Sequence, residues 1–468
     1  MSRDLALLTA SELARAIRSG GATSRQAVED NLARVEARNA ELNVFVALDA
    51  AHARAAADLA DSEARRGRFH GPLHGVPLAH KDMYYREGRV ATCGSNLRRG
   101  WVAPTTATAL SRLDAAGALD LGTLNMAEFA FGPTGHNWCV GHARNAWNSA
   151  HITGGSSSGS ATGVAARMFH AALGSDTGAS IRVPAHFCGV VGIKPTWGRV
   201  SRAGAMPLSW SLDTVGPLAR SVEDAALVLG LVAGVDPADP TAADIPVPDY
   251  VACLARGAKG LRIGVPTRFF TECDAETTRL LADAGRVLES LGAHLVPVEP
   301  PDMDRLNAFC SMVISCEAVT IHREWLRTRP QDYGDQVRAR LEAGLMIPAA
   351  YYLDAMRARG PMLDDFTAKV FGQCDMMLAP VTDSAAPTID ETAYGPGPDL
   401  GIKLGRFTKF TRCINYLGLP GLSVPAGFAA NGLPVGFQLV GRAFDEATLF
   451  AAGHAYQQAT EWHRRVPG

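Results

Sequence analysis

Two small-residue loops and one lysine in this sequence could together form a serine nucleophile with its base. The first loop, Gly154 to Ser160, holds four serines, and the second ends at Ser180 after an apolar run. Glycines let a backbone approach a ligand closely, and serine hydroxyls can act as a nucleophile or as a proton relay. Lys81 follows the apolar segment GVPLAH, so a buried strand would hold its amine away from water. Burial lowers the pKa of a lysine, which is the property that a general base needs.

Two other uses of the first loop lack part of their sequence motif. A phosphate-binding loop requires GxxxxGK[ST], and residues 154–160 contain no lysine. A hydrolase nucleophile elbow requires G-x-S-x-G, and Ser158 occupies its last position here. A serine nucleophile paired with a lysine base is a variant of triad chemistry. The residues therefore favour this pairing, and a histidine-based triad on His80, His170 or His186 is left open as the rival.

The segment after Ser180 predicts how this residue is positioned. It reads IRVPAHFCGVVGI, which is apolar and mostly uncharged, so Ser180 is expected to open a helix. A helix N-terminus carries free N–H donors and partial positive charge, which suits an anion that develops on a substrate.

Four sequence blocks resemble the signature blocks of the amidase signature family of serine hydrolases. They are GVPLAHKDM, GGSSSGSA, GSDTGASIRVPA and GIKPTWGRVSRAG, and they fall in order at the spacing of that family. The resemblance extends from about Ser11 to the C-terminal segment GFQLVGRAFDEATLFAAGHAYQQATEWH, which is most of the chain. It implies an α/β amidase signature fold, in which a large twisted mixed β-sheet is covered by helices on both faces.

The resemblance also implies a role for each polar residue of the two loops. Lys81 would be the base, Ser156 the bridging serine in a cis peptide after Gly155, and Ser180 the nucleophile that forms the acyl-enzyme. Ala179 stands where the family more often has a second glycine. The further residues that the resemblance implies are an oxyanion hole from the N–H groups of Thr177, Gly178, Ala179 and Ser180, and one wall of the acyl pocket from Ala130, Phe131 and Gly132.

Other titratable residues near the motifs are expected to have structural roles. Asp176 and Arg182 flank the nucleophile, and together with Ser157 they are expected to support its loop. Asp82, next to the lysine, is interpreted as a loop carboxylate that holds local N–H groups, with a direct effect on the lysine as the alternative. The histidines that could suggest a metal site are His136, His142 and His151. They lack ligand spacing such as HxxxH, so neither a metal nor a cofactor is expected.

Composition and charge are those of an ordinary globular protein. The 468 residues are 47% hydrophobic and 20% charged, and the net charge is −2 without any block of basic residues. A nucleic-acid-binding face needs clustered basic charge, so no nucleic-acid partner is expected. Nine scattered cysteines without a CxxC pair indicate reduced thiols. Because the sequence shows neither a secretory leader nor a membrane span, the expected location is cytoplasmic.

The chain is expected to form a single amidase domain over residues 1–468. Capping boxes at Thr9 and Thr23, and the helical spacing of apolar residues after them, predict that it begins with helices. The predicted parts are a helical N-terminal arm (1–66), a signature core of alternating strands and helices (71–233), a variable, mostly helical segment that supplies the substrate pocket (234–372) and the C-terminal part of the core (373–468).

Two functions are compatible with these residues. The first is a stand-alone amidase that acts through a Ser180 acyl-enzyme on small or aryl amides, with carbamates (urethanes) or esters as side substrates. The second is a glutamine-hydrolysing A-type subunit of a tRNA-dependent amidotransferase, which the signature blocks also resemble and which needs partner subunits. Phe129, Phe131 and Trp138 suggest an apolar pocket and therefore favour the first. Its expected partner is a small-molecule amide or carbamate, with no nucleic acid and no membrane, and with a homodimer left open.

Overall fold

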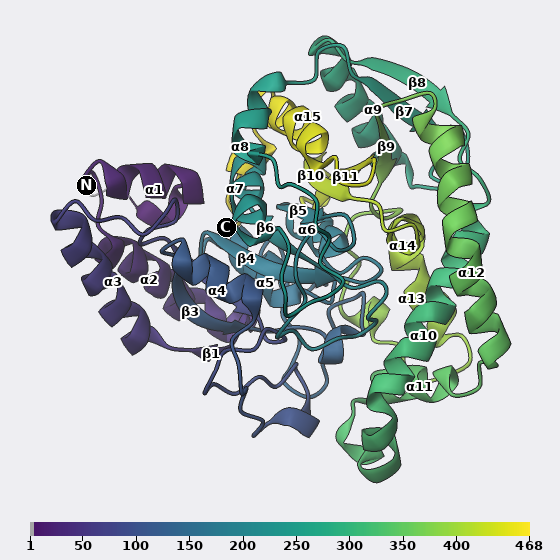
Figure 1. The fold of residues 1–468 in the computed structure, drawn as a ribbon, viewed down its shortest axis with the longest axis horizontal. Coiled ribbons are helices and arrows are strands. Elements are labelled where there is room, and N and C mark those ends of the chain that lie inside the picture. Colours follow the sequence, from purple (N-terminus) through teal and green to yellow (C-terminus); the bar gives the residue numbers. More distant parts are fainter. Residues whose placement is uncertain (1–3) are drawn as a thin grey trace.

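The computed structural model describes residues 4–468, which fold around two β-sheets (Figure 1). The larger sheet is mixed, because most neighbouring strands are antiparallel and the last two pairings at one edge are parallel. From edge to edge it contains β4 (Ala171–Asp176), β6 (Thr214–Ala219), β5 (Val191–Lys194), β10 (Gly421–Phe428), β11 (Pro434–Gly441), β9 (Met376–Pro380), β7 (Arg262–Pro266) and β8 (His294–Val298).

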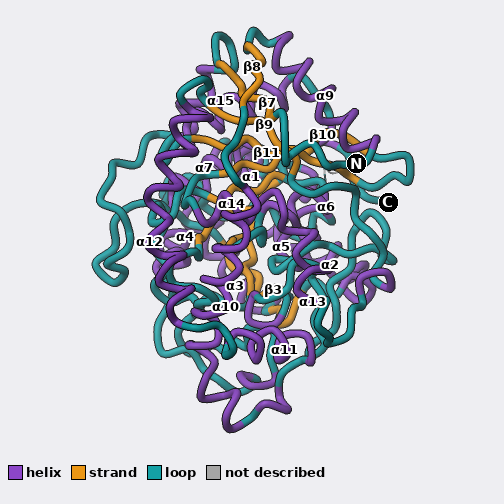
Figure 2. Tube along the Cα trace, turned by 90° about the vertical axis from the view of Figure 1, so that its right-hand side faces the viewer, coloured by secondary structure: helices purple, strands orange, loops and turns teal. Residues whose placement is uncertain are grey.

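Helices surround most of the strands, whereas β7 and β8 form a partly exposed edge of the large sheet, at the top of Figure 2. The helices of the described residues are α1 (Ala10–Arg18), α2 (Ser24–Leu42), α3 (Ala50–Arg65), α4 (Thr108–Ala115), α5 (Ser158–Ala165), α6 (Arg182–Cys188), α7 (Val222–Val232), α8 (Tyr250–Cys253), α9 (Ala275–Ser290), α10 (Met303–Thr328), α11 (Asp335–Gly344), α12 (Ala349–Phe366), α13 (Leu400–Gly405), α14 (Lys409–Tyr416) and α15 (Glu446–Gln458). Short 3-10 turns join several of them.

Strand β11 shows that helices cover both faces of the large sheet. Its Gln438 accepts a hydrogen bond from Arg182 of α6 at 3.1 Å. The preceding residue, Phe437, packs against Tyr456 of α15 with ring centroids 4.9 Å apart. Adjacent residues of a strand point to opposite faces, so α6 and α15 lie on opposite sides. This arrangement confirms the predicted fold, a large mixed sheet between two layers of helices.

A smaller sheet brings the lysine to the large one. In spatial order it contains β1 (Phe45–Leu48), β3 (Leu119–Leu124) and β2 (Pro77–Lys81). Strand β2 lies beside β4, because the N–H of Leu173 in β4 donates to Nδ1 of His80 in β2 at 3.2 Å. Lys81 is the last residue of β2, and every residue of this strand is buried. The small sheet therefore delivers the Lys81 side chain to the interior beside β4.

The N-terminal helices begin where the sequence predicts. Thr9 and Thr23 cap α1 and α2, and both reciprocal bonds of each capping box are formed. The residues of α2 that pack on the small sheet are Val28, Leu32 and Val35. The segment predicted as a helical arm also contributes β1, which pairs antiparallel with β3. The arm is therefore part of a sheet as well as a set of surface helices.

Helices α10, α11 and α12 form a layer along one side of the molecule, at the right of Figure 1. Helix α10 packs against α11, α12 and α14, and so connects this layer to the face that carries α6. Among residues 4–468, none of the helices combines the length and the apolar character needed to cross a membrane. The nine cysteines all lie in this range and are free thiols.

Candidate active site

Lys81 is completely buried and bonds to three serine hydroxyls. Its Nζ lies 2.6 Å from Oγ of Ser156, 2.9 Å from Oγ of Ser175 and 3.1 Å from Oγ of Ser157. Burial lowers the pKa of Lys81 to about 7, and the charges of Asp213 and other groups oppose this only in part. The serines therefore surround an amine that is readily neutral near pH 7.

The loop before α5 places Ser156 at the lysine. The peptide bond between Gly155 and Ser156 is cis, as predicted. Gly155 is tightly enclosed, because a side chain there would approach the carbonyl oxygen of Gly132 to 2.2 Å. The N–H of Ala127 donates to the Ser156 carbonyl at 3.1 Å. The neighbouring backbone thus holds this serine in place.

Ser180 lies in a turn before α6, and the prediction that it opens the helix is wrong. The helix begins at Arg182, because the Asp176 side chain accepts the N–H groups of Ile181 and Arg182 at 3.2 and 3.3 Å and takes the capping position. Ser180 lines a cavity. Its hydroxyl makes no hydrogen bond within residues 4–468. Of the two contacts in the predicted relay, the one between Lys81 and Ser156 is therefore present, and the one between Ser156 and Ser180 is not.

The turn from Thr177 to Ser180 keeps its N–H groups free of partners among the described residues, while its other polar groups are fixed. Thr411 donates to the Gly178 carbonyl at 2.7 Å, and the Thr177 hydroxyl donates to Asp213 at 2.5 Å. The backbone of Ala179 is outside the left-handed region, so its methyl group causes no backbone strain. Four predicted oxyanion donors therefore remain available at the edge of the cavity.

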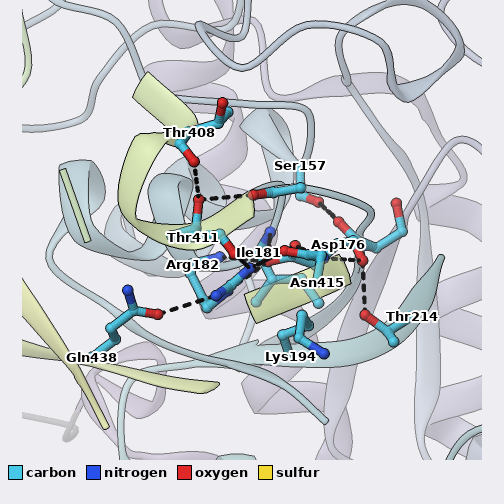
Figure 3. Close-up of polar contacts among 12 residues, drawn as sticks. Ser157, Asp176, Ile181, Arg182, Lys194, Thr214, Thr408, Thr411, Asn415 and Gln438 are labelled. Atoms are coloured by element: carbon cyan, nitrogen blue, oxygen red, sulfur yellow. Dashed lines mark hydrogen bonds and ion pairs between the residues drawn. The ribbon is translucent and has the colours of Figure 1, made fainter. Parts of the chain in front are cut away.

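A buried ion pair between Asp176 and Arg182 supports the turn from Thr177 to Ser180 (Figure 3). Arg182 donates to both carboxylate oxygens of Asp176 at 3.1 Å, and it also bonds to Gln438 and Asn415. Burial alone would raise the pKa of Asp176, but the charge and hydrogen bonds of Arg182 outweigh burial and lower it. Neither side chain is exposed. The two predicted support residues thus form one fully buried network behind the turn.

The predicted histidine rivals do not contact these serines. His80 accepts the N–H of Leu173, His170 bonds to the Leu5 carbonyl at 3.2 Å, and His186 accepts the N–H of Gly436 at 2.9 Å. Asp82 accepts the N–H groups of Thr92 and Gly94 at 3.2 and 3.3 Å, and burial raises its pKa to about 6. These contacts match a structural role for all four residues.

A cavity of about 410 Å³ opens beside Ser180. The predicted wall residues lie on it, namely Ala130, Phe131 and Gly132. Three residues that sequence analysis missed also belong to this region: Arg340 and Arg412 line the cavity, and Ser175 bonds to the lysine. Ser175 stands out in the sequence as a hydroxyl that directly follows the apolar residues 171–174 of β4, but neither arginine carries a comparable signal.

One group of possible metal ligands lies away from the cavity. Within residues 4–468, Glu63, His70 and His74 are close enough together to hold an ion. His70 Nε2 and a carboxylate oxygen of Glu63 form a hydrogen bond at 2.6 Å, and His74 bonds to the Ala60 carbonyl at 3.0 Å. This cluster on α3 and the following loop takes no part in the candidate active site.

Other proteins match the chain in sequence and in structure over nearly its full length. The A-type subunit of glutamyl-tRNA(Gln) amidotransferase from Halorhodospira halophila is 41% identical over 484 residues, covering 98% of each chain. The solved structure of the Thermotoga maritima protein of the same name has a TM-score of 0.83 and 29% identity, covering 100% of this chain and 98% of that one. Native peptide amidase from Stenotrophomonas maltophilia gives 0.84 and 33%, covering 98% of each chain.

These relatives contradict two predictions made from the sequence. A stand-alone enzyme for small or aryl amides, carbamates or esters, without a nucleic-acid partner, does not agree with relatives named as subunits of a tRNA-dependent enzyme. The physical basis of the prediction holds for Phe131, which lines the cavity, and fails for the other two aromatic residues. Phe129 is buried against Trp325 with ring centroids 5.5 Å apart, Trp138 is 53% exposed, and neither lines the cavity. A low net charge is no guide either, because other subunits of an assembly can bind RNA.

The sequence match extends beyond individual relatives. The family model described as Amidase matches residues 26–450, which include both serine loops and the lysine. The solved structures that resemble the chain over nearly its full length include a peptide amidase and an amidotransferase subunit. The chain therefore belongs to the amidase signature family, whose enzymes hydrolyse the C–N bonds of amides.

Proposed function

We propose that this chain is the glutamine-hydrolysing subunit of a tRNA-dependent amidotransferase. Its 41% identity to an A-type subunit, over the full length of both chains, supports this assignment. The structural observation that carries the hydrolytic part is a buried lysine bonded to serine hydroxyls, next to a cavity that Ser180 lines. With a net charge of −2, this chain would leave the basic surface that tRNA recognition requires to its partner subunits.

Lys81 acts as the base in its neutral form. An ammonium group has three N–H donors, whereas a neutral amine has two donors and one lone pair. The two remaining donors can serve Ser157 and Ser175, and the lone pair then accepts the O–H of Ser156 across the shortest of the three contacts, 2.6 Å. The serines thus direct the lone pair towards Ser156.

The reaction passes protons along two hydroxyls. Ser156 gives its proton to Lys81 and takes one from Ser180, whose hydroxyl turns towards it when substrate binds. The oxygen of Ser180 attacks the carbonyl carbon of the glutamine side-chain amide, and the electron pair of the carbonyl bond moves to oxygen. The N–H groups of residues 177–180 donate to this oxyanion, and the loss of one such donor typically costs about 10²–10³-fold in rate.

Collapse of the tetrahedral intermediate breaks the C–N bond. The proton returns through Ser156 to the leaving nitrogen, ammonia departs, and Ser180 holds the acyl group as an ester. Water then gives a proton to the same relay and attacks the ester carbon, which releases glutamate and restores Ser180. We assign Ala130, Phe131 and Gly132 to the wall of the acyl pocket. We assign Ser157, Asp176 and Arg182 to supporting the lysine and the Ser180 turn.

The pH dependence of hydrolysis should follow the protonation of Lys81. Only the neutral amine accepts a proton, so kcat/KM for glutamine should fall about tenfold per pH unit below an apparent pKa near 7. The carboxylate and the amide of glutamine do not titrate in this range. A rate that stays constant down to pH 5 would exclude the lysine as base. Lys194 is also buried with a pKa of about 7, and Lys194→Met should keep the same acid limb.

Ammonia release from glutamine tests the proposed function directly. We expect the purified chain to release ammonia slowly, and the rate to rise when the other subunits of a tRNA-dependent amidotransferase and glutamylated tRNA are added. Ser180→Ala in the same assembly should remove the activity. A chain that binds no such subunits, and that hydrolyses no glutamine with or without them, would contradict the assignment.

A further inference from the structure

The cavity beside Ser180 has an unbalanced charge. Two arginines, Arg340 and Arg412, line it, and none of the described aspartates or glutamates does. Each side chain is only partly exposed, and within residues 4–468 neither forms an ion pair. Positive charge that is partly removed from water and has no counter-charge in this part of the protein indicates that a ligand supplies it.

Arg340 is held over the cavity by groups that leave its charge uncompensated. It projects from α11, and its Nη1 donates to the Phe131 carbonyl at 2.8 Å. Its guanidinium lies on the ring of Phe131, 3.6 Å from the ring centroid. A peptide carbonyl and an aromatic face orient the side chain, but neither of them carries a negative charge. The other N–H donors of its guanidinium group remain available to a ligand in the cavity.

Arg412 lies against the turn that carries the proposed oxyanion donors. It follows Thr411, which bonds to the Gly178 carbonyl, and a side chain built at Gly178 would lie 3.7 Å from Cγ of Arg412. The Nε of Arg412 is buried and has no hydrogen-bond partner within residues 4–468. Buried donors in folded proteins nearly always have a partner, so this unsatisfied group is a second indication that a ligand binds here.

Two buried carboxylates next to residues of the cavity wall, Asp213 beside Thr177 and Glu317 on α10, are already engaged elsewhere. Asp213 accepts from the Thr177 hydroxyl and from two backbone N–H groups. Glu317 accepts from the hydroxyls of Ser211 and Tyr352 at 2.7 and 2.9 Å. Neither carboxylate lines the cavity. The proximity of Arg412 also adds to the effect of burial, which lowers the pKa of Arg340 to about 9.

The positive charge of the cavity discriminates between the carboxylate and the ammonium group of an amino acid. Guanidinium groups bind carboxylates through paired, charge-assisted hydrogen bonds. They repel an ammonium group, and a cavity without a carboxylate offers it no counter-charge. Glutamine carries both groups on one carbon atom, so its carboxylate suits the cavity and its ammonium does not.

We propose that the pocket selects primary amides whose acyl group carries a carboxylate and no ammonium group, such as the monoamides of dicarboxylic acids. This inference rests on the proposed hydrolysis at Ser180 and refines its substrate class. Glutamine is then a slower substrate than glutaramate, which is glutamine without its amino group. Arg340 and Arg412 together determine this preference, through contact with the carboxylate and through repulsion of cations.

Four amides that share the same four-carbon chain from the amide carbon, and differ only in the groups on its far end, separate the charges in one experiment. Glutaramate keeps only the carboxylate, glutamine has both groups, butanamide has neither, and 4-aminobutanamide keeps only the ammonium. We expect kcat/KM to fall in that order, with glutaramate at least about tenfold above glutamine and 4-aminobutanamide lowest. Ammonia release is the measurement for all four, and Ser180→Ala provides the blank.

Substitution of Arg412 shows whether its charge is responsible. In Arg412→Met, kcat/KM should fall for glutaramate, change little for butanamide and rise for 4-aminobutanamide. A variant that merely damages the fold would lower all of them together. Arg406→Met is the matched control, because Arg406 pairs with Asp383 and does not line the cavity. It should leave the order of the four substrates unchanged.

The outcomes distinguish this inference from the function on which it rests. If glutamine is hydrolysed as fast as glutaramate, or faster, the selection against ammonium is wrong and the glutaminase assignment stands. If glutaramate is hydrolysed and glutamine is not, even with partner subunits present, the selection is supported and the glutamine-dependent function fails. If none of the amides is hydrolysed in any assembly, both are wrong.

Discussion

Replacement of Lys81 by methionine is expected to lower kcat by about 10⁴-fold, the upper range for loss of a general base. Methionine has a similar length and fits a site without any exposure, so the variant should keep its fold. The hydroxyl of Ser156 would lose the base that lies 2.6 Å away, and Ser180 would remain a weak nucleophile. Ammonia release under saturating substrate measures kcat, and thermal unfolding shows whether the variant is folded.

Lys194 provides the control for this experiment. It is buried as completely as Lys81, and its pKa is also lowered by burial to about 7. Among the described residues, its ammonium group bonds only to the Pro195 carbonyl, at 2.8 Å. Lys194→Met should therefore keep a kcat close to that of the unmodified protein. A Lys81→Met protein that is folded and retains most of its activity would show that another residue is the base.

Replacement of Asp176 by asparagine is expected to lower the free energy of unfolding by about 3–5 kcal/mol, as when one partner of a buried ion pair is removed. The side chain keeps its size, so the loss comes from the charge. Arg182 would remain buried with a full positive charge and no carboxylate to accept its two 3.1 Å hydrogen bonds. Urea unfolding at neutral pH measures the change, and the loosened Ser180 turn should also reduce kcat.

An exposed ion pair is the appropriate comparison. Asp283 contacts Arg279 and Arg286 on the surface of α9, where all three side chains are at least one third exposed. Asp283→Asn should change the free energy of unfolding by less than about 1 kcal/mol, as is usual for surface pairs. If Asp176→Asn were no more destabilising than Asp283→Asn, the buried pair would not support the fold as we describe.

Local sequence signals were sufficient where the structure depends on neighbouring residues. The capping boxes at Thr9 and Thr23 work within four residues, and both helices begin there. The serine loops and the lysine were predicted through their resemblance to a family, and the structure brings Lys81 to Ser156. The position of Ser180 was less accurate, because the Asp176 side chain sets the start of α6 from outside the apolar run.

The remaining features depend on partners that are distant in the sequence. Strand β1 is only four residues long, and its pairing with β3 about 75 residues later determines that it is a strand. Phe129 and Phe131 are separated by one residue and both belong to the buried core, yet only Phe131 also lines the cavity. The charge of Arg340 and Arg412 becomes informative only when the structure shows that, among the described residues, no acid faces them.

The proposed base and the proposed nucleophile come from separate sheets, and this determines when the protein could react. Lys81 ends a strand of the small sheet, whereas Ser180 follows a strand of the large one. A growing chain on the ribosome carries Lys81 before Ser156 and Ser180 are made, and a chain that has opened at this junction holds Ser180 apart from Lys81. Such a chain cannot carry out the proposed hydrolysis, which can begin only when both layers have been synthesised and have docked.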